Sequence, residues 1–245
     1  GNVFNFIRKS LCNFAHYFIN FGAKVASYFW MFIQLNKGIL YRFATPEKSE
    51  VIIADINVIT STLSEDHLSA HQFGHSRERS LQMACADFII SDILNVDTKV
   101  LRTAKGAPYL KDNRFNLSIS HTSNYMAMIV NEHARPAIDI EVKGRNIDRV
   151  RYRFTIDEEV DHFHDFFKED ALLSVWGVKE CLFKIMHASG VLFTDHLKIN
   201  GSKVNGDRLI VDCHVDHPEI KSHFTVNSCI FEPLILSYID AAVDV

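Results

Sequence analysis

Two acidic residues alternate with apolar residues in the middle of the chain. Asp139 and Glu141 are interleaved with Ile138, Ile140 and Val142, which is the pattern of a strand with one apolar face. Side chains two positions apart on a strand point the same way, so the two carboxylates are close enough to share one hard cation. An ordinary polar face of a sheet is the alternative that this pair alone does not exclude.

A third acidic residue follows on a predicted helix. Residues 171–187 contain no proline and carry apolar residues at helical spacing, which predicts a helix over this range. Glu180 and Lys184 are four positions apart and share one face with Trp176. Such a pair is ordinarily a solvent-facing ion pair. Because Trp176 and Phe183 would expose large apolar areas on that face, we interpret it as the wall of a cleft.

The strand and the helix together could form a metal site. Asp139, Glu141 and Glu180 supply oxygen donors of the kind that Mg²⁺ prefers when it retains waters and contacts a phosphate. The sequence therefore predicts a Mg²⁺ site made from one strand and one helix.

A polar turn upstream could bind phosphate. Ser120, His121 and Thr122 separate two predicted strands, residues 115–119 and 127–130. Adjacent serine and histidine side chains in a turn can hold a phosphate oxygen, with the histidine acting as a cation or as a neutral donor. A histidine that is merely hydrated is the alternative.

These segments together resemble the signature of the 4′-phosphopantetheinyl transferases, in the Sfp-like branch. The resemblance rests on I-D-I-E at residues 138–141, on W-x-x-K-E-x-x-x-K at residues 176–184, and on N-L-S-I-S-H-T at residues 116–122. It covers roughly residues 50–239, about four fifths of the chain, and does not include the N-terminus.

The resemblance implies a reaction. The 4′-phosphopantetheine arm of coenzyme A would be transferred to a serine of an apo acyl or peptidyl carrier protein, with release of 3′,5′-ADP. Asp139, Glu141 and Glu180 would hold Mg²⁺, Glu180 would take the serine proton, and Lys184 would assist the departing phosphate. We expect a cytoplasmic, monomeric enzyme of fatty acid, polyketide or nonribosomal peptide biosynthesis.

The resemblance also implies contacts with coenzyme A. The residues that we expect to make them are Arg79, Lys105, Ser120, His121 and Lys179. The chain departs from the family at Ala107, where a Gly-Lys-Pro segment usually places a phosphate-binding lysine. We expect Lys105 to replace it, with Lys111 as the alternative.

Two further departures lie near the predicted metal site. Ala137 stands where the family has glycine, and Gly177 stands where it has a small hydroxyl or thiol residue. These differences, with Ala107, favour an alternative function: a non-catalytic module on the same fold that binds coenzyme A or a carrier protein.

The order of predicted elements indicates an α+β fold. Helices followed by strands recur in both parts of the chain, and the resemblance implies a 4′-phosphopantetheinyl transferase-like fold of two similar halves related by a pseudo-twofold. We place the halves at residues 49–135 and 136–245, with the metal site in the second. Residues 1–48 are expected to be a helical extension.

The predicted extension is basic and aromatic. Residues 1–46 carry five basic residues and no acidic one, which gives this segment a charge of +5. Because the whole chain has a net charge of −4, the remaining residues carry −9. This favours one or two helices packed on the acidic body of the protein. Contact with a membrane surface is the lower-ranked alternative, and Lys24 makes a membrane span unfavourable.

Composition restricts the class of protein. With 245 residues, 47% hydrophobic and 23% charged, the chain has the composition of a globular protein. Its negative charge disfavours a nucleic-acid partner. Five cysteines without a C-x-x-C motif indicate a reducing compartment.

Overall fold

The first strands form a four-stranded antiparallel sheet. The computed structural model describes residues 38–71, 76–186 and 188–242, so residues 1–37 of the predicted helical extension lie outside the described residues. The order in this sheet is β1-β2-β6-β5. Its strands are β1 (Ile39–Ala44), β2 (Glu50–Asp55), β5 (Asn116–Thr122) and β6 (Tyr125–Asn131).

Strand β1 corrects the predicted extent of the N-terminal helical extension. Residues 39–44 were expected to be helical but pair antiparallel with β2, with Phe43 opposite Val51. Ile39 and Phe43 are both buried, but a register shift between Ile39 and Tyr41 gives them different surroundings. Ile39 joins the core of the first sheet, whereas the Phe43 ring packs against the rings of Phe231 and Tyr238.

A long helix packs on this sheet. The first helices are α2 (Ile56–Ser61), α3 (Glu65–Ser69) and α4 (Arg77–Phe88), and a π-helix (Ile89–Ile93) continues α4. Ser76 caps α4 by accepting a hydrogen bond from the Arg79 backbone N–H at 3.3 Å. Buried Cys85 and Phe88 form a core with Ile52 and Met128. A short hairpin, β3 (Val100–Arg102) and β4 (Pro108–Leu110), follows.

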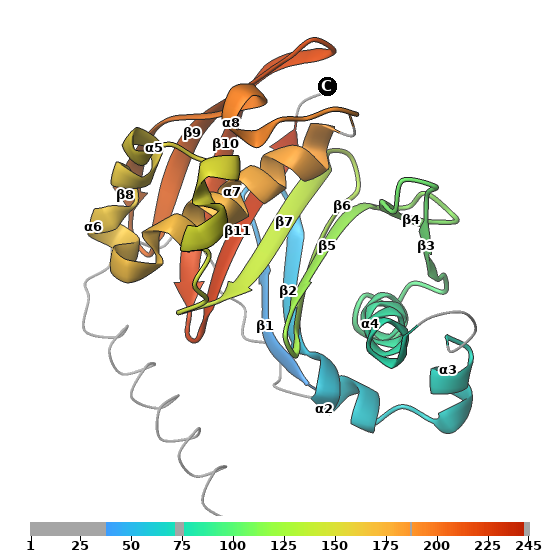
Figure 1. The fold of residues 1–245 in the computed structure, drawn as a ribbon. Helices are drawn as coiled ribbons and strands as arrows, with labels where there is room; N and C mark the ends of the chain where they lie inside the picture. Colours follow the sequence, from blue (N-terminus) through green and yellow to red (C-terminus); the bar gives the residue numbers. More distant parts are fainter. Residues whose placement is uncertain (1–37, 72–75, 187, 243–245) are drawn as a thin grey trace, which may run out of the picture. The chain divides into compact units, whose positions relative to one another are not determined.

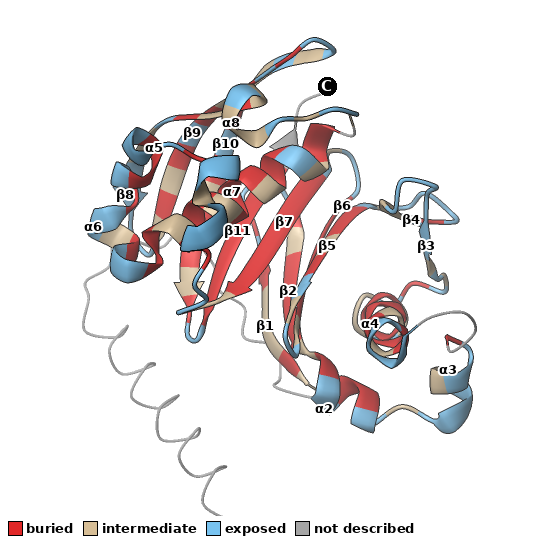
Figure 2. Cartoon of the chain, in the orientation of Figure 1, coloured by how far each residue is buried: buried red, intermediate tan, exposed pale blue. Residues whose placement is uncertain are grey.

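The second sheet has five antiparallel strands in the order β7-β11-β10-β9-β8. They are β7 (Arg135–Val142), β8 (Leu197–Asn205), β9 (Arg208–His217), β10 (Ile220–Phe231) and β11 (Leu234–Ala242). Helix α7 (Ala171–Met186) packs across this sheet (Figure 1). Its apolar residues Val175, Val178, Leu182 and Ile185 are fully buried, and Figure 2 shows the burial of α7 and β7.

Short helices complete the second part of the described chain. They are a 3-10 helix (Asp148–Arg153), α5 (Asp157–Asp161), α6 (His164–Phe167), a second 3-10 helix (Lys168–Asp170) and α8 (Phe193–His196). None of the helices within residues 38–71, 76–186 and 188–242 combines the length and apolarity needed to cross a membrane.

The two sheets come together where β5 lies beside β7 (Figure 1). The Ile138 backbone N–H donates to Ser118 Oγ at 3.2 Å across this junction. Away from it, Ser49 Oγ donates to the Asp240 carbonyl oxygen at 2.7 Å. The described residues belong to one compact unit, and a boundary between two halves at residue 135 stays a prediction.

Candidate functional site

Three elements of structure converge on the carboxylate of Asp139. This residue lies on β7 and is buried. Its Oδ1 accepts hydrogen bonds from Ser120 Oγ of β5 at 2.8 Å and from Lys184 Nζ of α7 at 2.9 Å. Lys184 Nζ also donates to the Ile138 carbonyl oxygen at 2.7 Å. The three segments that carry the predicted chemistry therefore meet at one atom.

The second oxygen of Asp139 has a different environment. Among the residues that the structure describes, Oδ2 is the buried side-chain oxygen without a hydrogen-bond partner. It faces Gly177 of α7, where an added Cβ would lie 3.5 Å from Oδ2 and 3.1 Å from Ser237 Oγ. A buried carboxylate oxygen that lacks a donor is unfavourable. Oδ2 is thus chemically suited to a cation.

Glu141 lies two residues further along β7, on the same face as Asp139. Its carboxylate is buried and forms an ion pair with Arg145 Nη1 at 2.5 Å. Thr122 Oγ1 of β5 approaches the same oxygen at 3.5 Å. Burial raises the pKa of Glu141, as does the charge of Asp139, whereas hydrogen bonds from Arg145 and Trp176 lower it. The strand prediction that both carboxylates face one side is confirmed by these contacts with β5.

Glu180 completes the group of carboxylates that we call the carboxylate cluster: Asp139, Glu141 and Glu180. It lies on α7, one turn before Lys184. The pKa of Glu180 is raised from its ordinary 4.5 to about 7. Burial is the largest cause, the charges of Asp139 and Glu141 act in the same direction, and the charge of Lys184 acts against them. The repulsion shows that the three carboxylates are close in space.

The side chains of the carboxylate cluster are not arranged with the geometry of a metal site. No group of three or more His, Cys, Asp or Glu side chains in the described part of the chain is arranged to hold a metal ion. Lys184 and Arg145 already pair with Asp139 and Glu141. The donor set still fits a hard cation, because it consists of carboxylate oxygens that include the unpaired Oδ2 of Asp139.

The raised pKa of Glu180 predicts how stability depends on pH when a chelator is present. Between about pH 4.5 and 7 the folded protein keeps a proton that the unfolded chain releases. The contribution of Glu180 to the free energy of unfolding should therefore fall as pH rises through this window and stay constant above it. Urea unfolding of the wild type and of Glu180→Gln with EDTA tests this expectation.

The matched control is Glu132→Gln, which changes an exposed glutamate and should unfold with the pH dependence of the wild type. If Glu180→Gln keeps the wild-type dependence between these pH values, the proposed protonation of Glu180 is wrong.

His121 lies at the end of β5, beside cationic side chains. The amide nitrogen of Gln82 on α4 is 3.2 Å from His121 Nδ1. Burial lowers the pKa of His121, and the charges of Arg102, Lys184 and Arg79 lower it further, against the effect of Glu78. Of the two predicted forms, the neutral donor is therefore favoured at neutral pH. We call His121, Arg79, Arg102 and Lys184 the basic cluster.

Arg102 is a residue that the sequence analysis missed. It lies on β3, and its Nη1 donates to the Gly106 carbonyl oxygen at 2.9 Å. Burial lowers the pKa of Arg102, and the nearby charge of Arg79 lowers it further. Nothing in the local sequence distinguishes it from an ordinary exposed arginine. Its position beside His121 and Arg79 depends on packing between β3, α4 and β5.

The other predicted coenzyme contacts occupy different positions. Arg79 is in the first turn of α4, as expected from the Ser76 cap. Lys105 is exposed in the turn between β3 and β4, next to Gly106, which has a φ of +88°. This turn brings Lys105 into the hairpin that also carries Arg102, but at its solvent-exposed end.

Lys179 corrects one of the predicted contacts. Its side chain is fully buried, and its Nζ forms an ion pair with Glu159 Oε2 at 2.6 Å. Glu159 also accepts hydrogen bonds from Thr155 Oγ1 at 2.8 Å and from the Ile199 backbone N–H at 3.0 Å. One residue before Glu180 on a helix, Lys179 points about 100° away from it. Its position supports a structural role in the core rather than contact with a coenzyme.

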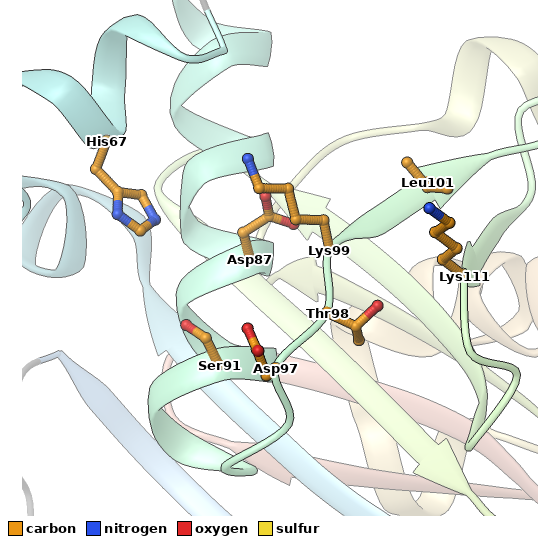
Figure 3. A pocket seen from close by; sticks show the side chains of 8 residues that line it. All are labelled: His67, Asp87, Ser91, Asp97, Thr98, Lys99, Leu101 and Lys111. Atoms are coloured by element: carbon orange, nitrogen blue, oxygen red, sulfur yellow. The ribbon is translucent and has the colours of Figure 1, made fainter.

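A cavity of about 510 Å³ lies at a separate place, beside the C-terminal part of α4 (Figure 3). Its lining includes His67, Asp87, Lys99 and Lys111. Lys111, the predicted alternative to Lys105, thus contributes to this cavity. The cavity lining does not include the carboxylate cluster, so we assign the site from the converging side chains instead.

Part of the chain is similar in sequence to a known protein. No family model matches the chain. A Haemophilus influenzae protein described as "Putative 4'-phosphopantetheinyl transferase" is 32% identical over 95 residues. The match spans 36% of this chain and 40% of the relative. This similarity supports a relationship with the 4′-phosphopantetheinyl transferase superfamily, and it does not distinguish the branch.

Proposed function

We propose that the protein transfers the 4′-phosphopantetheine arm of coenzyme A to a serine of an acyl or peptidyl carrier protein. The observation that carries this proposal is the contact of Ser120 and Lys184 with one carboxylate oxygen, Asp139 Oδ1. This contact joins the carboxylate cluster to the basic cluster. A reaction at the pyrophosphate of coenzyme A needs both: oxygen donors for a divalent cation, and cations for phosphate oxygens.

The carboxylate cluster supports the choice of Mg²⁺ as the metal. Asp139, Glu141 and Glu180 would hold it, and the unpaired Oδ2 of Asp139 is the atom that most needs a cation. When bound, Mg²⁺ would neutralise charge that develops on the pyrophosphate. Mg²⁺ binds ionised carboxylates, and burial opposes ionisation by raising the pKa of Glu141 and of Glu180, against the effects of Arg145 and Lys184.

Glu180 is the proposed general base. In the transfer, the serine hydroxyl oxygen forms a bond with the β-phosphorus of coenzyme A, and the bond from this phosphorus to the bridging oxygen breaks. The serine proton passes to Glu180, and 3′,5′-ADP leaves with the bridging oxygen. Glu180 is a suitable acceptor because its carboxylate lies one turn before Lys184 on α7 and near Asp139 and Glu141, so the proton is taken up beside the groups that would hold the metal and the phosphate.

Lys184 is the proposed stabiliser of the departing phosphate. Burial alone would lower its pKa, but the Asp139 carboxylate outweighs this effect and the pKa is raised. Lys184 therefore remains an ammonium group. Two of its N–H groups are directed at Ile138 and Asp139, which leaves the third for a phosphate oxygen.

The basic cluster supports a site for the remaining phosphate groups. Arg79, Arg102 and His121 come from three different elements, and their charges influence one another. The charges of Arg79 and Arg102 repel each other, so a phosphate would relieve this repulsion, and neutral His121 would donate a hydrogen bond to it. In this proposal Arg102 takes the place of the lysine missing at Ala107, and Lys105 contributes less.

Arg102→Gln and Lys105→Ala test this assignment. Arg102→Gln is expected to raise the KM for coenzyme A by about tenfold, as for the loss of one charge-assisted hydrogen bond, with a smaller change in kcat. Both side chains are exposed, but Lys105→Ala should raise KM by about threefold or less, because the proposal assigns the phosphate to Arg102, beside Arg79 and His121. Steady-state kinetics with varied coenzyme A gives both values.

The control for this pair is Arg114→Gln, an exposed arginine near Asp112 that should leave KM unchanged. If Lys105→Ala raises KM more than Arg102→Gln does, the phosphate contact belongs to Lys105 instead.

The proposed reaction has a direct test. The protein is incubated with coenzyme A, Mg²⁺ and apo carrier proteins of the acyl and peptidyl types, and the carriers are weighed by mass spectrometry. The expected result is a carrier heavier by one phosphopantetheine group, together with an equivalent amount of 3′,5′-ADP. If none of the carriers gains mass while a known transferase modifies the same samples, the proposed reaction is wrong.

A non-catalytic module that binds coenzyme A or a carrier protein is the second candidate function. The pairing of Asp139 with Lys184 and of Glu141 with Arg145 favours it, because both carboxylates already have a cation. The departures at Ala107, Ala137 and Gly177 point the same way. Calorimetric binding of coenzyme A without transfer to any carrier would support this candidate over the enzyme.

A further inference from the structure

The ion pair between Glu141 and Arg145 joins two very different environments. The Glu141 side chain is 7% exposed, whereas the Arg145 side chain is 50% exposed. Arg145 lies beyond the end of β7, after Gly144, whose φ is +77°. This turn directs the chain back so that a residue outside the strand reaches a carboxylate inside the site. Glu141 is therefore neutralised from the solvent side.

The cation at Asp139 is held in another way. Lys184 belongs to the long helix α7, is 25% exposed, and also bonds the Ile138 carbonyl oxygen. It uses Asp139 Oδ1 and leaves Oδ2 without a partner. Oδ2, which is buried beside Gly177, is therefore the oxygen that Asp139 would offer to a metal ion while Lys184 stays on Oδ1. At Glu141, by contrast, the guanidinium charge opposes an arriving cation.

We propose that Arg145 is an internal counter-ion of Glu141 that weakens the binding of a divalent metal to the carboxylate cluster. The inference rests on the proposed function, because it takes the carboxylate cluster to be a metal site. A half-exposed arginine on a turn can move into solvent without unfolding a helix or a strand. Arg145 thus sets the metal affinity through its contact with Glu141 and does not contact the reacting groups itself.

The experiment measures Mg²⁺ binding by isothermal titration calorimetry of the full chain at pH 8. Removal of the opposing charge in Arg145→Gln should tighten binding by about fivefold, the scale of a partly exposed ion pair. The matched control is Arg149→Gln, which removes an exposed arginine four residues further on and should bind within about twofold of the wild type.

Arg145→Lys separates charge from folding. It keeps the positive charge and is expected to bind Mg²⁺ with nearly wild-type affinity, so it remains informative if Arg145→Gln does not fold. A gain in Arg145→Lys as large as that expected for Arg145→Gln would overturn the proposal. An unchanged or weaker affinity in folded Arg145→Gln would also overturn it.

Thermal unfolding provides a second readout that does not depend on activity. In EDTA, Arg145→Gln should melt below the wild type, because the buried Glu141 loses its partner. Saturating Mg²⁺ should raise its Tm by more than it raises that of the wild type. An equal increase in both proteins would contradict the proposed competition.

Asp139→Asn distinguishes this inference from the proposed function. If Asp139→Asn lowers Mg²⁺ affinity but Arg145→Gln leaves it unchanged, the metal site stands and the role of Arg145 is wrong. If Asp139→Asn binds Mg²⁺ as the wild type does, the carboxylate cluster is not the metal site, and the proposed function loses its support.

Discussion

Replacement of Asp139 by asparagine is expected to reduce carrier modification by at least about 100-fold. Asparagine preserves the size of the side chain but removes the negative charge that faces Lys184 and Ser120. In asparagine, the position of the unpaired Oδ2 is taken either by a neutral amide oxygen, which is a weaker metal ligand than a carboxylate oxygen, or by the amide nitrogen, which does not bind Mg²⁺. Both the metal and the orientation of Lys184 would be affected. The rate of carrier modification at saturating coenzyme A and Mg²⁺ is the measurement.

The control for this prediction is Asp148→Asn, which changes an exposed aspartate in the first 3-10 helix and should keep the wild-type rate. Circular dichroism and Tm establish that Asp139→Asn is folded. A folded Asp139→Asn protein that modifies carriers at the wild-type rate, with the same Mg²⁺ dependence, would contradict the proposed site.

The second large effect is expected at Lys179. Lys179→Met should lower the free energy of unfolding by about 3–5 kcal/mol, because it leaves Glu159 buried without its ion-pair partner. For a chain of this size, such a loss corresponds to a decrease in Tm of roughly 10 °C. The KM for coenzyme A should not change, since the side chain is enclosed in the core. Urea unfolding and steady-state kinetics of the same protein test both statements.

Two further variants make this test specific. Lys203→Met removes an exposed lysine of β8 and should leave stability nearly unchanged. The double variant Lys179→Met/Glu159→Leu should recover part of the lost stability, because no charge is left buried without a partner. If Lys179→Met is as stable as the wild type and raises the KM for coenzyme A, the original assignment of Lys179 as a coenzyme contact is right.

Local sequence predicted the elements that carry the carboxylate cluster. The helix expected over residues 171–187 is observed as Ala171–Met186, and Asp139 and Glu141 lie on one face of β7 as expected. These features follow from periodicity, which sets the direction of each side chain within its own element.

Local periodicity did not identify β1 as a strand. Residues 39–44 are apolar at most positions without a regular apolar–polar alternation, and their basic and aromatic surroundings favoured a helical extension. Residues 39–44 form a strand because antiparallel pairing with β2 satisfies the backbone N–H and C=O groups of β1. Residues 1–37 of the predicted helical extension lie outside the described residues, and their helical structure stays a prediction.

Residue type and local spacing identify side chains that are suited to catalysis or to metal binding, whereas the packing of β5, β7 and α7 establishes which charges meet. Lys179 and Lys184 are both lysines of α7, yet one pairs with Glu159 in the core and the other with Asp139 in the site. Arg102 and Arg145 were not among the predicted site residues, but folding places them beside His121 and Glu141. The physical reason is that electrostatic interactions depend on distance and burial, which the contact of β5, β7 and α7 fixes and sequence spacing does not.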